Sequence, residues 1–213
     1  MDKSEMTIII SCAGMGTRLG IGTTKALVHV GGKTIIARQL ELLKDYDDVR
    51  VVVGYQAEGI IEEVNKTRRD VMFAFNGDYK TTGAGASLSK ALRGTRKYVV
   101  AMDGDLLFRP EDFERFMEEP GECIGVCEDH SDEPIRLVQE GDFITKINDP
   151  AGTKEWSCIT KVLAARLTPG EGGIDEMIRP LLPLKAVPVA VCDLDTQDDF
   201  ERMLNWFRKG YKD

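Results

Sequence analysis

The sequence is poor in histidine, with 2 among 213 residues, and its 5 cysteines include no C-x-x-C pair. An odd, scattered set of cysteines predicts reduced thiols in a cytoplasmic protein rather than a disulfide framework. Cys123 and Cys127 have no matching His or Cys pair downstream, which argues against a zinc site. Cys12, Cys158 and Cys192 lie in apolar runs, and we expect them to be small core residues.

Positive charge is also scarce, because 28 lysines and arginines are outnumbered by 36 aspartates and glutamates, for a net charge of -8. A general nucleic-acid surface requires the opposite excess, so no nucleic-acid partner is expected. No apolar stretch is long enough to span a membrane, and the N-terminal MDKSEM lacks the apolar core of a signal peptide. We therefore expect no membrane insertion.

Apolar β-branched runs alternate with helical patterns through the first half of the chain. Buried strands are predicted at 7–10, 49–53, 71–75 and 98–102, with a short extended piece at 26–30 and a helix at 34–44. Such alternation predicts an α/β fold with a three-layer, Rossmann-like arrangement around a mixed, mostly parallel sheet.

The second half has a different sequence pattern, with a short helix after Pro110 and several strand-like segments. Strands are expected at 123–127, 135–139, 143–147, 157–167 and 187–192, and helices at 174–182 and after Thr196. We interpret residues 1–213 as one domain, with a nucleotide-binding half at 1–109 and an acceptor-binding cover at 110–213.

A glycine-rich loop with two cations follows the first predicted strand. Its glycines are Gly14, Gly16, Gly20 and Gly22, and its cations are Arg18 and Lys25. Glycines allow backbone N–H groups to surround an anion, and the cations suggest a polyphosphate. A Walker A motif fits poorly, because the segment 32–34 (GKT) is preceded by Leu27 where the first glycine belongs. A dinucleotide fingerprint fails because Leu19 takes the place of its third glycine.

Two acidic pairs end apolar strands at the edge where parallel sheets bind ligands. Asp103 and Asp105 follow the strand at 98–102, and Asp193 and Asp195 follow the strand at 187–192. An isolated D-x-D is most often a solvated turn, but two such pairs at one edge favour a metal site. Carboxylate oxygens suit Mg²⁺, which is the expected cofactor.

The loop pattern G-x-G-T-R-(spacer)-K resembles the nucleotidyltransferases of the nucleoside-diphosphate-sugar pyrophosphorylase type. The segments KALVHVGGKTIIARQLELL, VVAMDGDLLF and DLDT are similar to that family as well. The family usually has proline where this chain has Thr24. The resemblance implies a GT-A-type fold. It also implies catalytic roles for Arg18 and Lys25, metal binding by Asp105, Asp193 and Asp195, and nucleotide binding by Ala13, Gly14, Gly16, Thr17, Gly83, Gly85, Ala86, Ser87 and Asp103.

The chemistry expected of such a site is transfer of a nucleoside monophosphate from an NTP to a phosphorylated small molecule, with release of pyrophosphate. The attacking phosphate is already an anion and needs no general base, which suits the scarcity of histidine. The segments FNGDY and DLDTQDDFERM resemble the small phosphocholine and inositol-phosphate cytidylyltransferases. That resemblance favours CTP and a phospho-alcohol, while a sugar 1-phosphate stays open as acceptor.

Other functions are compatible with parts of this pattern. A GT-A-type glycosyltransferase uses a D-x-D and a metal but has little use for the cationic loop. A molybdopterin-type guanylyltransferase shares the K-A-L-x-x-x-G-G-K segment, and a nucleotide-sensing module would bind without turnover. Homo-oligomerisation is compatible with all of them.

Several conspicuous side chains are given ordinary structural roles. We expect a core position for Trp156 and a surface position for Lys161, although both lie near the predicted acceptor pocket. The remaining assignments are surface or structural positions for His29 and His130, and a solvated helix face for Glu111, Asp112, Glu118 and Glu119.

Overall fold

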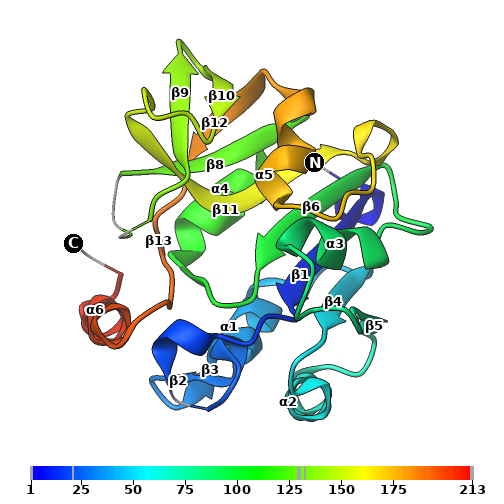
Figure 1. Ribbon diagram of the computed structural model, residues 1–213, viewed down its shortest axis with the longest axis vertical. Helices are drawn as coiled ribbons and strands as arrows, with labels where there is room; N and C mark the ends of the chain where they lie inside the picture. The colour runs from blue at the N-terminus through cyan, green and yellow to red at the C-terminus, as the bar shows by residue number, and fades with distance from the viewer. Residues whose placement is uncertain (1, 21, 129–130, 132, 212–213) are drawn as a thin grey trace.

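A computed structural model describes residues 2–20, 22–128, 131 and 133–211 of the chain. A nine-stranded mixed sheet runs through the molecule in the order β5-β4-β1-β6-β11-β8-β12-β10-β9 (Figure 1). Its strands are β1 (Met6–Cys12), β4 (Val49–Val53), β5 (Met72–Phe75), β6 (Tyr98–Asp103), β8 (Cys123–Cys127), β9 (Arg136–Glu140), β10 (Phe143–Ile147), β11 (Lys154–Leu163) and β12 (Leu184–Pro188). Two short pairs accompany this sheet: β2 (His29–Val30) with β3 (Lys33–Thr34), and β7 (Leu107–Phe108) with β13 (Val191–Cys192).

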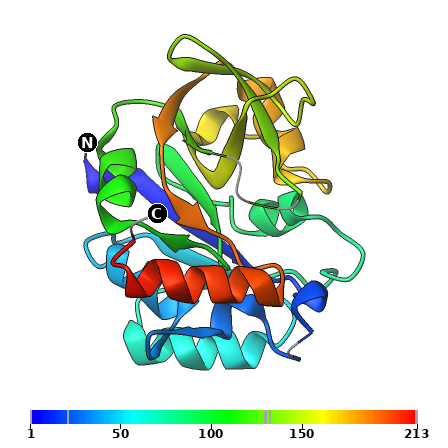
Figure 2. The same cartoon turned by 90° about the vertical axis from the view of Figure 1, so that its left-hand side faces the viewer.

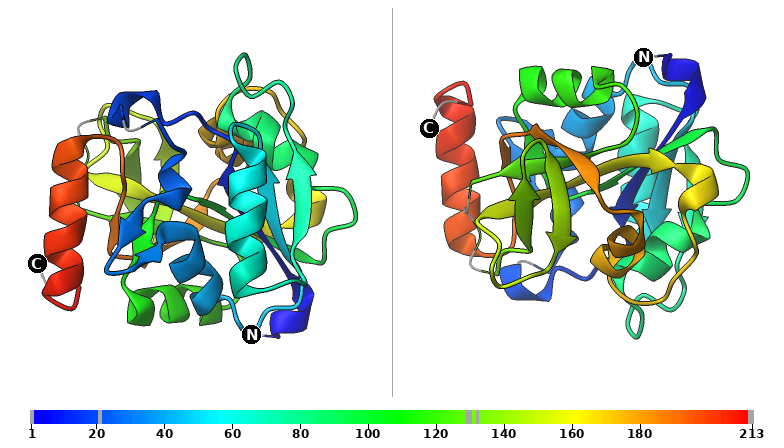
Figure 3. Two further views of the ribbon diagram at one scale, coloured as in Figure 1. Left: turned by 90° about the horizontal axis from the view of Figure 1, so that it is seen from below. Right: turned by 90° about the horizontal axis from the view of Figure 1, so that it is seen from above.

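Helices cover both faces of the sheet, so the molecule has three layers (Figure 3). One face packs against α1 (Ile35–Leu42), α2 (Ala57–Thr67) and α4 (Pro110–Glu118), and the other against α3 (Ala84–Lys90) and α5 (Ile174–Ile178). A further helix, α6 (Gln197–Arg208), lies along the outside of the molecule (red in Figure 2). The predicted three-layer α/β fold is confirmed.

The central strands are mostly apolar because both of their faces are covered. In β1, Ile8 and Ile10 face the α1–α2–α4 layer, and Ile9 faces the α3–α5 layer. All three side chains have 0% exposure. Burying each one contributes about 1.5–3 kcal/mol. A strand that is covered on both faces needs apolar residues at successive positions, and this is why the run TIII shows no alternation of polar and apolar residues.

The second half continues the same sheet with mostly antiparallel strands. β11 runs antiparallel between β6 and β8, and β12 returns parallel to β8. The first residues of β11 also pair with β9, which closes β11, β8, β12, β10 and β9 into a ring. The parallel part is thus formed by β5, β4, β1 and β6.

Three predicted elements differ clearly from the structure in their bounds. The strand expected at 157–167 is β11, which begins at Lys154 through its pairing with β9 and ends before a 3-10 turn. The helix at 174–182 stops at Ile178, because Pro180 cannot continue the α-helical hydrogen bonds. The extended piece at 26–30 begins as a 3-10 turn, and only β2 is extended.

The strand expected at 187–192 is divided in two. β12 ends at Pro188, and the chain then leaves the main sheet and pairs as β13 with β7. The segment after β13 is thereby carried to the end of β6, the edge predicted for Asp193 and Asp195, but the sequence pattern did not reveal the break in the strand. The helix predicted after Thr196 is confirmed as α6, and Thr196 and Asp199 form a reciprocal capping box at its start.

Two charged residues that were expected at the surface are buried. Lys161 has 0% exposure, and its Nζ donates to the carbonyls of Phe116, Met117 and Glu119 at the end of α4. Asp112 is 8% exposed and accepts from the backbone N–H of Ala190 at 3.0 Å. Both therefore serve the packing of α4 on the sheet.

Other assignments agree with the structure. Trp156 is buried in the core, and His29 is exposed, whereas His130 lies outside the described residues. Cys12 and Cys192 are buried as expected, but Cys158 is only half buried. Among the described residues, no helix is long and apolar enough to cross a membrane.

Replacing Lys161 tests the helix cap that it forms. In Lys161→Met the three carbonyls at the end of α4 lose a charged donor in a buried place, so we expect a loss of about 2–3 kcal/mol in the free energy of unfolding. The matched control is Lys33→Met, because Lys33 is 52% exposed and pairs with Glu41, which is 48% exposed. Chemical denaturation should show nearly unchanged stability for the control, and equal effects of both substitutions would refute the buried cap.

Candidate active site

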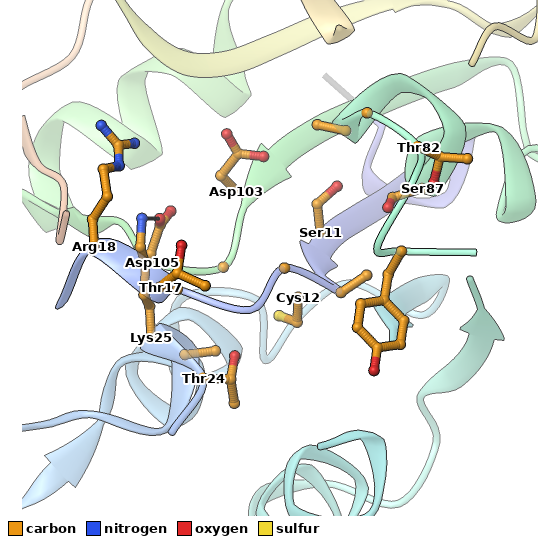
Figure 4. A pocket seen from close by; sticks show the side chains of 18 residues that line it. Ser11, Cys12, Thr17, Arg18, Thr24, Lys25, Thr82, Ser87, Asp103 and Asp105 are labelled. Carbon is orange, nitrogen blue, oxygen red and sulfur yellow. Dashed lines mark hydrogen bonds and ion pairs between the residues drawn. The ribbon is translucent and has the colours of Figure 1, made fainter. Parts of the chain in front are cut away.

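A pocket of about 330 Å³ lies at the carboxyl ends of β1 and β6 (Figure 4). Three segments form its wall: the loop after β1, the segment that leads into α3, and the turn that follows β6. The predicted residues that line it are Ala13, Gly14, Gly16, Thr17, Arg18, Lys25, Gly83, Ser87, Asp103 and Asp105. The pocket therefore gathers most of the predicted site from segments far apart in the sequence.

The loop after β1 turns sharply and is held at its far end by Gln56. Gly16 has a φ of 58°, in the left-handed region, and begins a 3-10 turn that carries Arg18. Gln56 Oε1 accepts the backbone N–H of Thr24 at 3.1 Å, and its Nε2 donates to the carbonyl of Gly22 at 2.9 Å. These bonds fix the end of the loop beside Lys25.

The same contact explains why threonine stands where the family usually has proline. Thr24 has a φ of −67°, which proline would accept. Its N–H, however, donates the hydrogen bond that Gln56 accepts, and proline has no N–H. The backbone conformation is therefore the one that proline favours, stabilised here by a side chain.

Lys25 joins two carboxylates that come from distant parts of the chain. Its Nζ lies 2.9 Å from Asp105 Oδ2 and also forms an ion pair with Asp195 Oδ1. The side chains of Lys25, Asp105 and Asp195 are 16%, 24% and 22% exposed. Burial alone would lower the pKa of Lys25, but the charge of Asp105 and the bonds to both carboxylates raise it well above its ordinary value.

Arg18 adds a second cation to this group. Its guanidinium lies 2.9 Å from Asp195 Oδ1 and 2.9 Å from Glu133 Oε2. The arginine is half exposed, so these pairs are weaker than those of Lys25. Asp193 lies two residues before Asp195 and lines an adjacent cavity of about 190 Å³ together with Arg18.

Asp103 differs from its neighbours because it is deeper. Burial, followed by the negative charge of Asp105, raises the pKa of Asp103 above its ordinary value. Its carbonyl accepts a hydrogen bond from Gln39, while its side chain faces the pocket (Figure 4). The turn from Asp103 to Asp105 thus presents one carboxylate to Lys25 and another to the interior of the pocket.

The segment that leads into α3, residues 76–85, is the second loop of the site, and it is shaped by packing. The N–H groups of Gly83 and Gly85 donate to the carbonyls of Glu171 and Gly172, at 3.0 and 2.8 Å. A Cβ at Gly83 would lie 2.2 Å from the carbonyl oxygen of Gly172. Gly83 and Ser87 line the pocket, whereas Gly85 and Ala86, which were also predicted to bind the nucleotide, do not line it.

Some residues of the site carry no obvious sequence signal. Asn76 has 1% exposure, and its Nδ2 donates to Thr82 Oγ1 and Ser87 Oγ, which holds the second loop in place. Tyr79 and Thr82 line the pocket directly. An asparagine directly after the predicted strand at 71–75 is the one signal that would have pointed to this group.

A divalent cation would find suitable ligands here. No group of three or more His, Cys, Asp or Glu side chains in the described part of the chain is arranged to hold a metal ion. Asp105 and Asp195 nonetheless converge on one point, since both contact the same nitrogen of Lys25. Two hard carboxylate donors fit Mg²⁺ and do not fit a soft metal.

These features define an α/β protein whose pocket, at the carboxyl edge of its sheet, combines two cations with a carboxylate pair, as expected of a nucleotidyltransferase. Residues 8–187 match the family model described as the MobA-like NTP transferase domain, and the chain belongs to this family. The predicted family resemblance is confirmed.

Curated relatives are longer than this chain. The bifunctional protein GlmU of Aliarcobacter butzleri is 29% identical over 156 residues, which cover 71% of this chain and 35% of that protein. GlmU of Sulfurimonas denitrificans is 25% identical over 126 residues, which cover 58% and 29% of the two chains. The chain thus spans about a third of the length of these relatives.

Solved structures share the fold over nearly their whole length. The inositol-1-phosphate CTP transferase of T. maritima has a TM-score of 0.76 at 14% identity, covering 100% of this chain and 99% of that one. The CTP:phosphocholine cytidylyltransferase of Streptococcus pneumoniae has a TM-score of 0.74 at 22% identity, covering 95% and 99%. HddC of Yersinia pseudotuberculosis has a TM-score of 0.75 at 18% identity, covering 94% and 99%.

The packing of the second loop can be tested at two of its glycines. Gly83→Ala should push the loop away from Gly172 and so raise the KM for the nucleotide several-fold, with a stability loss of about 1–3 kcal/mol. Gly77→Ala is the matched control, because a Cβ there meets nothing within 4 Å and its φ is not left-handed. Steady-state kinetics that show equal KM values for both variants would contradict this role of Gly83.

Proposed function

We propose that the protein transfers a nucleoside monophosphate from an NTP to a phosphorylated small molecule, releases pyrophosphate, and requires Mg²⁺. The observation that carries this proposal is the convergence of Asp105 and Asp195 on Lys25 at the wall of the pocket. Membership of an NTP transferase family supports the reaction class. The five free cysteines support a cytoplasmic location.

In this reaction a phosphate oxygen of the acceptor attacks the α-phosphorus of the NTP. A new P–O bond forms as the bond to the pyrophosphate breaks, and the leaving group carries away the electron pair. No proton has to be removed from the anionic nucleophile, so catalysis consists of alignment and charge neutralisation. Arg18 and Lys25 are the cations placed to perform that neutralisation.

The loop from Gly14 to Arg18 would hold the phosphates through its backbone N–H groups. Ser87 and Gly83, at the other side of the pocket, would meet the nucleoside. Asp105 and Asp195, with Asp193 beside them, would hold Mg²⁺. A bound Mg²⁺ would neutralise phosphate oxygens and orient them for in-line attack.

CTP and a phospho-alcohol are the favoured substrates, with a sugar 1-phosphate as the other acceptor class. The support comes from the structures that share the fold, which include a CTP transferase for inositol 1-phosphate and a phosphocholine cytidylyltransferase. We assign acceptor binding to the second half of the chain. There the carboxyl ends of β8 and β12 border a further cavity of about 560 Å³.

Guanylyl transfer is a second candidate. The matching family model is described as MobA-like, and HddC, which shares the fold, has been solved in complex with GMP-PN. A GTP preference would favour this candidate over cytidylyl transfer.

The substrates can be identified by measuring pyrophosphate release with the four NTPs against sugar 1-phosphates and phospho-alcohols, with Mg²⁺. We expect turnover with CTP and a phospho-alcohol, and its loss when Mg²⁺ is chelated. Hydrolysis of NDP-sugars, without pyrophosphate release from any pair, would instead identify a glycosyltransferase and overturn the proposal.

Substitution of the charged residues tests their roles in this assay. Lys25→Ala and Asp105→Asn should each lower kcat by at least about 10²–10³-fold, since each removes a group that stabilises charge in the transition state. Lys33→Ala is the matched control, because Lys33 is exposed, pairs with Glu41 and lies outside the pocket lining. An Asp105→Asn variant with wild-type turnover would refute the metal assignment.

A further inference from the structure

A buried glutamine on α1 holds the turn that carries Asp105. Gln39 has 1% exposure, and its Nε2 donates to the carbonyl of Asp103 at 2.9 Å and to that of Leu106 at 2.8 Å. One amide group therefore spans the turn from its first residue to its last. Asp105 lies between these two anchor points.

The rest of the turn has little freedom. The N–H of Gly104 donates to the carbonyl of Ser11 at 2.9 Å, which ties the turn to β1. A Cβ at Gly104 would lie 2.3 Å from Cys12 Sγ. Any residue other than glycine at this position would therefore push the turn away from β1. The bonds from Gln39 and the bond to Ser11 together determine where the Asp105 backbone lies.

The orientation of the Gln39 amide follows from its partners. Both are carbonyl oxygens, which accept hydrogen bonds, so only the NH₂ group can face them. Gln39 Oε1 is buried and has no hydrogen-bond partner among the described residues. A buried acceptor without a partner disfavours folding. The favourable contribution of this polar side chain therefore comes from its hydrogen bonds to the two carbonyls.

We propose that Gln39 is a positioning residue, which fixes the turn so that the Asp105 carboxylate meets Lys25 and Mg²⁺ in the right place. This inference rests on the proposed function for the metal, but the hydrogen bonds themselves do not. A merely structural glutamine would change stability when replaced and would leave the metal affinity of the folded protein unchanged.

The test compares Gln39→Met with wild type in two measurements. Hydrogen exchange should become at least about tenfold faster in the segment 103–108, because the turn loses both anchors. Mn²⁺ affinity, measured by electron paramagnetic resonance with α,β-methylene CTP present, should fall about tenfold, as for other groups that orient a metal ligand. We expect kcat to fall more than the KM for the NTP changes.

Thr160→Val is the matched control. Thr160 has 0% exposure, its hydroxyl has no partner among the described residues, and it lies outside the pocket lining. This substitution also removes one buried polar group, and it should leave Mn²⁺ affinity and exchange at 103–108 unchanged. If Gln39→Met does not fold, Gln39→Leu is the second variant, because it likewise offers no donor to either carbonyl and favours a helix.

Each result supports or overturns the inference. Wild-type Mn²⁺ affinity in the folded Gln39 variants, or wild-type exchange at 103–108, would overturn the positioning role and leave the proposed function intact. A wild-type protein that binds neither Mn²⁺ nor the nucleotide would overturn the proposed function. It would overturn the metal-positioning role with it, while the exchange result would still decide whether Gln39 holds the turn.

Discussion

The contact of one lysine with two carboxylates is the interaction on which the site depends. Lys25 is separated by 80 residues from Asp105 and by 170 from Asp195, yet its ammonium group touches both. All three side chains are largely shielded from water, so their mutual attraction is stronger than that of an exposed pair. Because the cation comes from the loop after β1 and the anions from two other strand ends, three segments must be placed together before the site exists.

The fold places them by two devices. Parallel strands bring the loop after β1 and the turn after β6 to the same edge of the sheet. The chain then leaves the sheet at Pro188 and pairs with β7, which carries Asp195 to that edge from the end of the chain. Polar side chains secure the loops themselves, with Gln56 at the end of the first loop and Asn76 in the second.

Much of this could be predicted from the sequence, for a physical reason. The strands β4, β8 and β10 were predicted with their observed bounds, because polar or glycine residues stand directly before and after each of them. The cationic loop and both acidic strand ends were found because each carries its own local pattern. Lys161 was misplaced because its burial depends on carbonyls of α4 more than 40 residues away. Gln39 and Gln56 gave no signal, since a glutamine looks the same in sequence whether it faces solvent or holds a loop.

The most direct test of the site formed by Lys25, Asp105 and Asp195 is a crystal structure of the protein with Mg²⁺ and α,β-methylene CTP. We expect the triphosphate along the loop from Gly14 to Arg18, the metal on Asp105 and Asp195, and the Lys25 ammonium group moved onto a phosphate. A nucleotide bound outside this pocket, with Lys25 still joining both carboxylates, would contradict the account.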